Sequence, residues 1–202
     1  MNWLHRIFRD IAPGKAALLV SIGLLMAGCG VNAIPTEQEQ AKAAWSEVQN
    51  QYQRRADLIP NLVNTVKGYA TQERTVLTDV TEARAKATAV QVNANQLTDP
   101  EALRRFEAAQ AQLSGSLGRL LAVSENYPDL KSNQNFLALQ SQLEGTENRI
   151  TVARRDYIQA VQSYNTDVRT FPGRFWAMVY NAQPMATFTT TEENQRPPTV
   201  QF

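Results

Sequence analysis

The segment Glu144-Gly145-Thr146-Glu147-Asn148-Arg149 carries the residues of this chain that are best placed for chemistry. Glu144 and Glu147 are three positions apart, so on a helix they share one face. Two carboxylates can perform general acid–base catalysis when burial raises one of their pKa values. The same spacing suits carboxylates that are solvated or paired with arginine. We expect the second role, in which Glu144 or Glu147 pairs across helices with Arg54 or Arg55.

Other catalytic chemistry is limited by the residue types present. The chain has one cysteine, Cys29, and one histidine, His5, both within the first 30 residues. If that segment is cleaved or lipidated, the remainder has no thiol or imidazole for Cys-His or Ser-His-Asp catalysis, zinc binding or disulfides. We also find no glycine-rich phosphate loop, so we expect no cofactor and no metal. The net charge of +1 gives no electrostatic reason to bind nucleic acid.

Residues 1–28 have the three-part pattern of a secretory signal peptide: a basic part, an apolar part and small residues. The basic residues are Arg6, Arg9 and Lys15, and the apolar run is Ala16 to Met26. Met26-Ala27-Gly28-Cys29 resembles the lipobox of bacterial lipoproteins. In such signals the cysteine thiol receives a diacylglyceryl group, and the chain is cut just before it. The sequence therefore predicts a signal peptide at 1–28 and a lipidated linker at 29–35.

An uncleaved, single-pass membrane anchor is the alternative. A spanning helix needs about 20 apolar residues, and glycines together with Asn32 interrupt residues 16–34. In both cases residues 35 onward lie outside the cytoplasm, because basic residues stay on the cytoplasmic side. Gly30 follows the cysteine, where an aspartate often marks retention at the inner membrane. In a cell with two membranes we therefore expect attachment to the outer membrane, facing the periplasm.

The body of the chain has the apolar periodicity of long helices. From Trp45 to Val90, apolar residues recur every three or four positions, which keeps one stripe facing a neighbouring helix. Pro60 lies inside this stretch, cannot donate a backbone hydrogen bond and is expected to kink the helix near Arg55. Asn61 and Asn64 are expected to satisfy the carbonyl that the proline leaves free.

Two further long helices are predicted. The second starts at Thr98-Asp99-Pro100-Glu101, which supplies a cap, an early proline and an acid in the first turn. It ends at Tyr127-Pro128-Asp129. The third runs from about Ser132 to Thr170, and a short amphipathic helix follows at Arg174–Tyr180. Gly145, inside the third helix, is expected to allow close packing of a neighbour.

These elements predict an all-α fold, an antiparallel up-down bundle of three long helices plus a short C-terminal helix. The first and third helices would then run in the same direction. Thr36 and Glu39 can form a capping box, so the bundle is expected at residues 36–180. Residues 181–202 are polar and are expected to form a flexible tail.

Aromatic residues on these segments fall into two groups. The first group lies on the helix stripes and is predicted to be in the core: Tyr52, Tyr69, Tyr157 and Tyr164. The second group lies near the C-terminus: Phe175, Trp176, Tyr180 and Phe188. These could contact a membrane interface or a partner. We expect them instead to cap the open end of the bundle.

Two long stretches of the sequence resemble the LemA family. The first is YQRRADLIPNLVNTVKGYA, Tyr52 to Ala70, with its continuation through Val80 and Glu82-Ala83-Arg84, and the second is Tyr127 to Pro172. One departure is Thr71-Gln72-Glu73, which stands where the family often has a histidine before the glutamate. The resemblance implies a membrane-attached, mainly extracytoplasmic helical bundle, sometimes associated with membrane metalloprotease or stress systems. It implies no catalytic residues for this chain.

We therefore expect a membrane-tethered, non-catalytic scaffold or adaptor of the bacterial cell envelope. Its partners would be membrane lipid, through acylated Cys29, and an envelope protein. One alternative is a lipid-tethered enzyme, which needs two carboxylates that converge on a cleft. Another is a small-ligand binder with a pocket between helices. The sequence makes no prediction of the oligomeric state.

Overall fold

The computed structural model describes residues 30–188, which form helices and short connections with no β-strand in that range. The predicted all-α class is confirmed. The predicted signal peptide at 1–28, Cys29 and residues 189–202 lie outside the described residues. Among the described helices, none combines the length and the apolar character that crossing a membrane requires.

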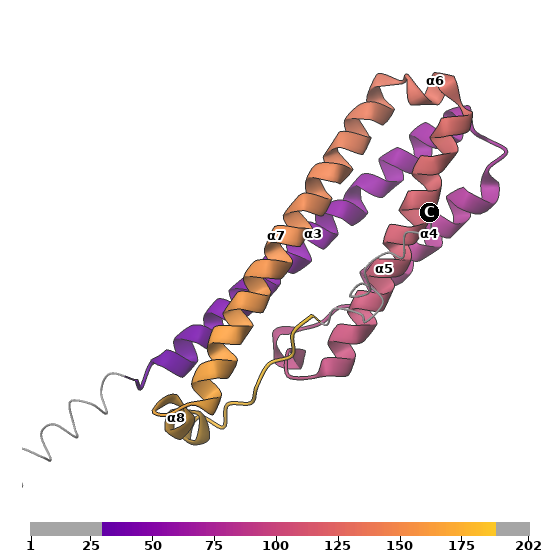
Figure 1. Ribbon diagram of the computed structural model, residues 1–202. Helices are drawn as coiled ribbons and strands as arrows, with labels where there is room; N and C mark the ends of the chain where they lie inside the picture. The colour runs from indigo at the N-terminus through magenta and orange to yellow at the C-terminus, as the bar shows by residue number, and fades with distance from the viewer. Residues whose placement is uncertain (1–29, 189–202) are drawn as a thin grey trace, which may run out of the picture.

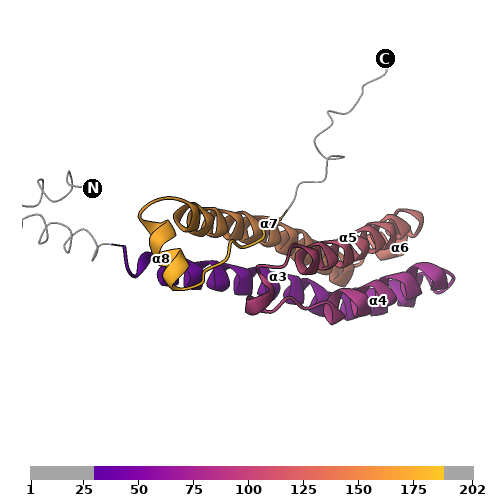
Figure 2. The same ribbon diagram turned by 90° about the horizontal axis from the view of Figure 1, so that it is seen from below.

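Two long helices run antiparallel along the length of the molecule, and a shorter helical hairpin packs beside one half of them (Figure 1). The long helices are α3, Ala33–Tyr69, and α7, Gln134–Arg169; the hairpin consists of α4, Arg74–Ala89, and α5, Pro100–Val123. The connections contain the short helices Ala94–Gln96, Ser124–Asn126 and α6, Pro128–Lys131. Helix α8, Gly173–Val179, lies at the opposite end from α6, beside the start of α3 (Figure 2).

The predicted number of long helices is wrong, because the first predicted helix is two helices. Helix α3 ends at Tyr69, and the chain turns back at residues 70–73 into α4. The apolar stripe continues across this turn because Val66, Ala70 and Leu77 all face the same core. The extra reversal makes α3 and α7 antiparallel, whereas the sequence predicted the same direction for these segments.

The folded body extends beyond the predicted 36–180 at both ends. Helix α3 begins at Ala33 without a side-chain cap, so the Thr36 capping box does not form, and Ile34 is buried. Residues 181–188 return along the bundle, where the Ala186 N–H donates to the Leu97 carbonyl at 2.8 Å. The prediction of a linker is therefore wrong for residues 33–35, which belong to α3. The prediction of a flexible tail is wrong for residues 181–188, which pack on the bundle.

The hydrophobic core has two parts along the bundle. The aromatic cluster centres on Trp45, whose ring lies 5.2–5.9 Å from three other rings, those of Phe106, Tyr157 and Phe188. The aliphatic cluster lies toward α6 and consists mainly of Leu and Val from all four main helices. Tyr52, Tyr157 and Tyr164 are buried as predicted. Tyr69 is 44% exposed, contrary to prediction, because it is the last residue of α3.

Helix α3 continues through Pro60 because another helix satisfies the carbonyl that the proline leaves free. In a regular helix the N–H of residue 60 would donate to the Ala56 carbonyl. Here the Arg84 Nε of α4 donates to that carbonyl at 2.7 Å. Asn61 and Asn64 are exposed, so the prediction that they take this role is wrong. The carbonyl that Pro60 leaves free thus provides a hydrogen bond between α3 and α4.

We expect Arg84→Met to lower the free energy of unfolding by about 1.5–3 kcal/mol, the usual contribution of a hydrogen bond that involves a charged group. In a Pro60→Ala background the alanine N–H replaces the lost donor. The effect of Arg84→Met should then fall by more than half, which a double-mutant cycle by chemical denaturation measures. Equal losses in both backgrounds would show that Arg84 stabilises the bundle in some other way.

Gly145 in α7 is not a close-packing position. An added Cβ at this residue would have no atom of a neighbouring helix or loop within 4 Å, so the predicted close approach of a neighbour is wrong. A glycine inside a helix costs about 1 kcal/mol relative to alanine. We expect Gly145→Ala to raise the free energy of unfolding by that amount, as urea denaturation measures.

Gly173 is a matched control for Gly145. A Cβ at Gly173 would lie 2.3 Å from the Asp167 carbonyl oxygen, so Gly173→Ala should destabilise the chain. A loss of stability in Gly145→Ala as well would contradict our description of that site.

Candidate functional site

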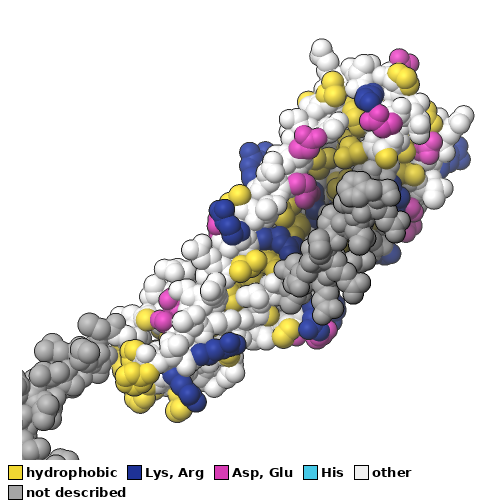
Figure 3. All heavy atoms as spheres, viewed as in Figure 1, with side chains coloured by type: hydrophobic (Ala, Val, Ile, Leu, Met, Phe, Trp, Pro, Cys, Tyr) yellow, Lys and Arg dark blue, Asp and Glu magenta, His cyan; other side chains and the backbone are white. Residues whose placement is uncertain are grey.

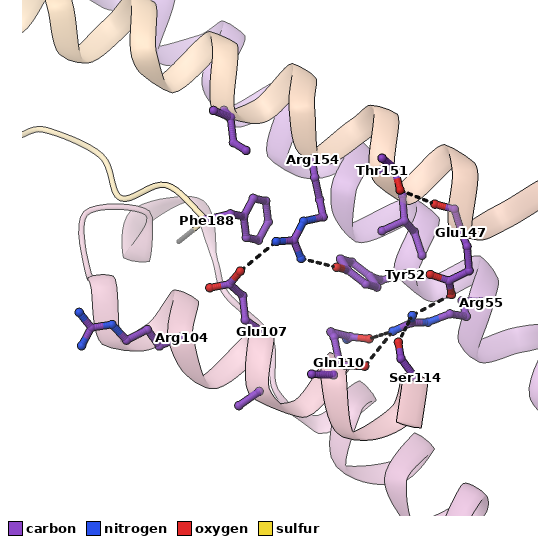
Figure 4. Close-up of a pocket in the computed structure, with 14 residues that line it drawn as sticks. Tyr52, Arg55, Arg104, Glu107, Gln110, Ser114, Glu147, Thr151, Arg154 and Phe188 are labelled. Atoms are coloured by element: carbon purple, nitrogen blue, oxygen red, sulfur yellow. Dashed lines mark hydrogen bonds and ion pairs between the residues drawn. The ribbon is translucent and has the colours of Figure 1, made fainter. Parts of the chain in front are cut away.

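A buried arginine lies at the centre of the bundle, between the two core clusters. Arg55 occupies a core-facing position of α3 and is 1% exposed. Its Nη1 donates to Glu147 Oε1 of α7 at 2.8 Å and to Ser114 Oγ of α5 at 2.8 Å (Figure 4). Its Nη2 donates to Gln110 of α5, at 2.7 Å to the side-chain oxygen and 3.3 Å to the carbonyl. One guanidinium therefore joins three helices.

Gln110 extends this polar layer to the fourth helix. It is buried, and its Nε2 donates to the Ala87 carbonyl of α4 at 3.3 Å. Thr146 of α7, also buried, bonds back to the carbonyl of Gln142 in its own helix. A polar layer of this kind favours the one register in which its donors and acceptors meet, since any slip leaves a buried charge unpaired.

A second arginine, Arg154 of α7, lies about two turns further along the same side. Its Nη2 donates to Glu107 of α5 at 3.0 Å, and its Nη1 donates to the Tyr52 hydroxyl of α3 at 3.1 Å. Its guanidinium lies 4.0 Å from the centre of the Phe188 ring, a cation–π arrangement. Figure 4 shows these side chains converging from three helices and the C-terminal segment.

Two buried tyrosines hold that C-terminal segment against α7. Burial raises the pKa of the Tyr157 phenol, so the hydroxyl stays protonated and donates to the Ala186 carbonyl at 2.8 Å. Burial also raises the pKa of Tyr164, which donates to the Gln183 carbonyl at 3.0 Å. These bonds and the Asn165 side chain, which pairs with the Met185 backbone, place Phe188 beside Arg154.

A groove of about 760 Å³ runs between α5 and α7. Helix α5 packs mainly on α4, and α7 packs mainly on α3, so this side of the bundle is more open. Both arginines line the groove, together with Tyr52 on its floor and Phe188. We call it the α5–α7 groove. The residues of its two walls are Arg104, Glu107, Ala108, Gln110, Ala111 and Ser114 of α5, and Glu147, Ile150, Thr151, Arg154 and Ile158 of α7.

The groove carboxylates are engaged by arginines. Glu147 accepts from Arg55 and Glu107 accepts from Arg154, so each carboxylate faces its own guanidinium. Arginine has donors only and stays protonated in proteins, so it supplies no general base. Within residues 30–188, no group of three or more histidine, cysteine, aspartate or glutamate side chains could hold a metal ion. The arrangement can fix helix register and bind polar or aromatic groups.

The structure brings together two of the residues singled out from the sequence, Arg55 and Glu147. Arg54 is exposed on the outer side of α3, as are Pro60 and Asn61. Glu144 is exposed and accepts a hydrogen bond from Gln140. Arg149, further along α7, is also exposed. Sequence reasoning missed the roles of four residues: Glu107, Gln110, Ser114 and Arg154. The polar slot at Gln110, inside the apolar stripe of α5, is the signal that could have revealed Gln110.

The fold and this site define a class of protein: an elongated antiparallel helical bundle with an arginine-centred polar layer and a groove along one side. Residues 44–202 match the model of the LemA family, and the chain belongs to that family. The segment Thr71-Gln72-Glu73, in which the sequence departs from the family pattern, forms the turn between α3 and α4. There Glu73 accepts a hydrogen bond from the Tyr127 hydroxyl at 3.1 Å.

Known proteins related to this chain come from several bacteria. The magnetosome protein MamQ of Magnetospirillum gryphiswaldense is 26% identical over 85% of this chain and 71% of its own length. The magnetosome protein MamQ 2 of Paramagnetospirillum magneticum is 26% identical over 73% of this chain and 60% of its own length. Protein LemA of Metamycoplasma hominis is 25% identical over 80% of this chain and 69% of its own length.

Proposed function

We propose that this chain is a lipid-tethered, extracytoplasmic scaffold or adaptor of the cell envelope, acting through protein contacts. The observation that carries the proposal is the α5–α7 groove, in which two ion pairs, Arg55–Glu147 and Arg154–Glu107, link different helices. Such a groove offers a shaped surface to a partner, with apolar, aromatic and polar contacts side by side. In this proposal the ion pairs keep the groove in shape and take part in no reaction.

The tether part of the proposal rests on the lipobox-like sequence ending in Cys29. Helix α3 begins at Ala33, so the folded body would start within a few residues of the lipidated cysteine. Two or more acyl chains hold a protein stably on a membrane, whereas a single chain does not. With Gly30 after the cysteine, we propose the outer membrane in a cell with two membranes, facing the periplasm. A single-pass anchor in the inner membrane is the competing arrangement.

A second candidate function is the binding of a small ligand in the same groove. Ligand sites have volumes of roughly 300–1,000 Å³ with a few polar groups among apolar ones, and the groove of about 760 Å³ fits that description. We prefer a protein partner because the groove is an open channel between two helices. An enzyme that uses Glu144 and Glu147 has less support, since Glu144 is exposed on α7 and bonded to Gln140, whereas Glu147 contacts Arg55.

Site-specific photo-crosslinking in native membranes tests the adaptor proposal. A photoreactive phenylalanine at Ala111 and another at Thr151 would lie on the two walls of the groove. Gln112 and Arg149 are matched controls, because they are exposed on the same two helices and lie outside the groove. We expect both wall positions to give one protein adduct of the same mass and both controls to give none. If neither wall position gives a protein adduct, the adaptor proposal is wrong and the small ligand is favoured.

A further inference from the structure

The α8 end of the bundle carries apolar side chains that no part of the described chain covers. Figure 3 shows hydrophobic side chains gathered at that end, with Lys or Arg side chains beside them. Five large residues are exposed there by 46–87%: Phe171, Phe175, Met178, Val179 and Tyr180. We call them the end-face patch. Soluble proteins rarely expose this many adjacent apolar residues unless another surface meets them.

Capping of the bundle does not account for the end-face patch. Ala177 is buried and Trp176 packs against the aromatic cluster, so these two residues of α8 close the end of the core. The sequence-based expectation of a cap therefore holds for Trp176. It is wrong for Phe175 and Tyr180, which face outward, and for Phe188, which lies in the groove. The outward residues remain available for an external surface.

The end-face patch lies beside residues 30 and 31, the first residues that the structure describes. The Tyr180 hydroxyl donates to the Val31 carbonyl at 3.2 Å. An added Cβ at Gly30 would lie 3.3 Å from Trp176 Nε1, so α8 contacts the start of the described chain directly. Figures 1 and 2 show α8 beside the first turn of α3. A lipid attached at residue 29 would thus be adjacent to the patch.

The charges around the end-face patch suit the lipid headgroup region. The segment Arg169–Tyr180 contains two arginines, Arg169 and Arg174, both exposed, and no aspartate or glutamate. Two carboxylates at the same end of the bundle, Glu37 of α3 and Asp167 of α7, are partly buried. Aromatic side chains favour the membrane interface, where an apolar ring can be buried while polar edges stay wet. Basic side chains beside them attract anionic headgroups.

We infer that the end-face patch docks on the lipid surface to which the chain is tethered. The bundle then stands with its long axis leading away from the membrane, and the α5–α7 groove lies beyond the headgroups. This inference rests on the proposed tether. It adds a second point of contact, since α8 is about 140 residues from Cys29 along the chain yet lies at the same end of the fold.

Quenching by spin-labelled lipids tests this orientation on the full chain reconstituted in vesicles. A fluorophore is attached at Met178→Cys, in the end-face patch, and in a second protein at Leu137→Cys. Leu137 is 48% exposed at the far end of α7, about 48 Å from Arg169 at 1.5 Å per residue. Acylation leaves Cys29 without a thiol, so the unsubstituted chain should take no dye and serves as the background.

We expect headgroup-region spin labels to quench the probe at position 178 at least twofold more than the probe at 137. Flotation of the same samples reports the tether separately. Flotation with the probe at 178 unquenched would overturn the end-face inference alone. Equal quenching of both probes would overturn it too, because the bundle would then lie along the membrane. A chain that does not float, or whose Cys29 takes the dye, would contradict the proposed lipid tether as well.

Discussion

Arg55→Ala is expected to lower the free energy of unfolding by about 2–5 kcal/mol, the usual cost of truncating a large buried side chain to alanine. The arginine is 1% exposed and donates to side chains of two other helices, Gln110 and Ser114 of α5 and Glu147 of α7. Its loss leaves a cavity between the two core clusters and buried acceptors without donors. Thermal or urea unfolding, followed by circular dichroism, measures the change.

Two further substitutions divide this effect into its causes. Arg55→Met restores most of the side-chain volume, so it should destabilise the chain clearly less than Arg55→Ala. The Glu147 side chain is 49% exposed although its partner is 2% exposed, so Glu147→Ala should cost about 1–2 kcal/mol, between the values for exposed and buried pairs. Glu147→Gln should cost less, because its amide oxygen still accepts from Arg55.

The same variants separate structure from chemistry. In a structural role, the loss of partner crosslinking at the groove follows the loss of stability from variant to variant. Glu147→Gln with unchanged stability and abolished function would contradict this account. That result would support a catalytic or recognition role for the Glu144–Arg149 segment.

Cys29→Ala is expected to abolish acylation and cleavage of the chain altogether. The thiol is the acceptor in the lipobox-like sequence Met26-Ala27-Gly28-Cys29, and alanine offers no nucleophile for the lipid. Labelling with a fatty-acid analogue should disappear, and the longer, uncut form should accumulate. The uncut form should remain with the membrane through the apolar run Ala16 to Met26.

Met26→Leu is the matched control for this substitution, because leucine is the commoner residue at that lipobox position. It should keep labelling and processing at least at the level of the unsubstituted chain. If Cys29→Ala leaves both unchanged, the lipoprotein proposal fails and the single-pass anchor takes its place.

The sequence predicted best those features that depend on neighbouring residues. Asp99 accepts a hydrogen bond from the Glu101 N–H, and Pro100 occupies the first position of α5, so that helix start could be read locally. The start and end of α7 were also predicted within about two residues. A cap, a proline or a change of composition marks each of these boundaries.

The features that the sequence did not predict depend on packing between distant segments. The turn after Tyr69 has neither glycine nor proline at residues 70–73, and the apolar stripe stays in phase across it. The segment 181–188 looks polar, yet Met185 and Phe188 are buried against α7 and Trp45. The sequence also singled out Arg54 or Arg55 as the partner of Glu144 or Glu147. Which residue of α7 lies opposite Arg55 depends on the antiparallel pairing of α3 and α7. The sequence did not predict this pairing, because it did not predict the turn at residues 70–73.

The intact mass of the chain extracted from the membranes of its own organism tests the central claim most directly. That claim is that a lipid on Cys29, the first residue of the mature chain, tethers the folded helical bundle to a membrane. We predict a mature chain that begins at Cys29, lacks residues 1–28 and carries a diacylglyceryl group with at least two acyl chains. A chain that retains residues 1–28 and has the mass of the unmodified sequence would contradict it.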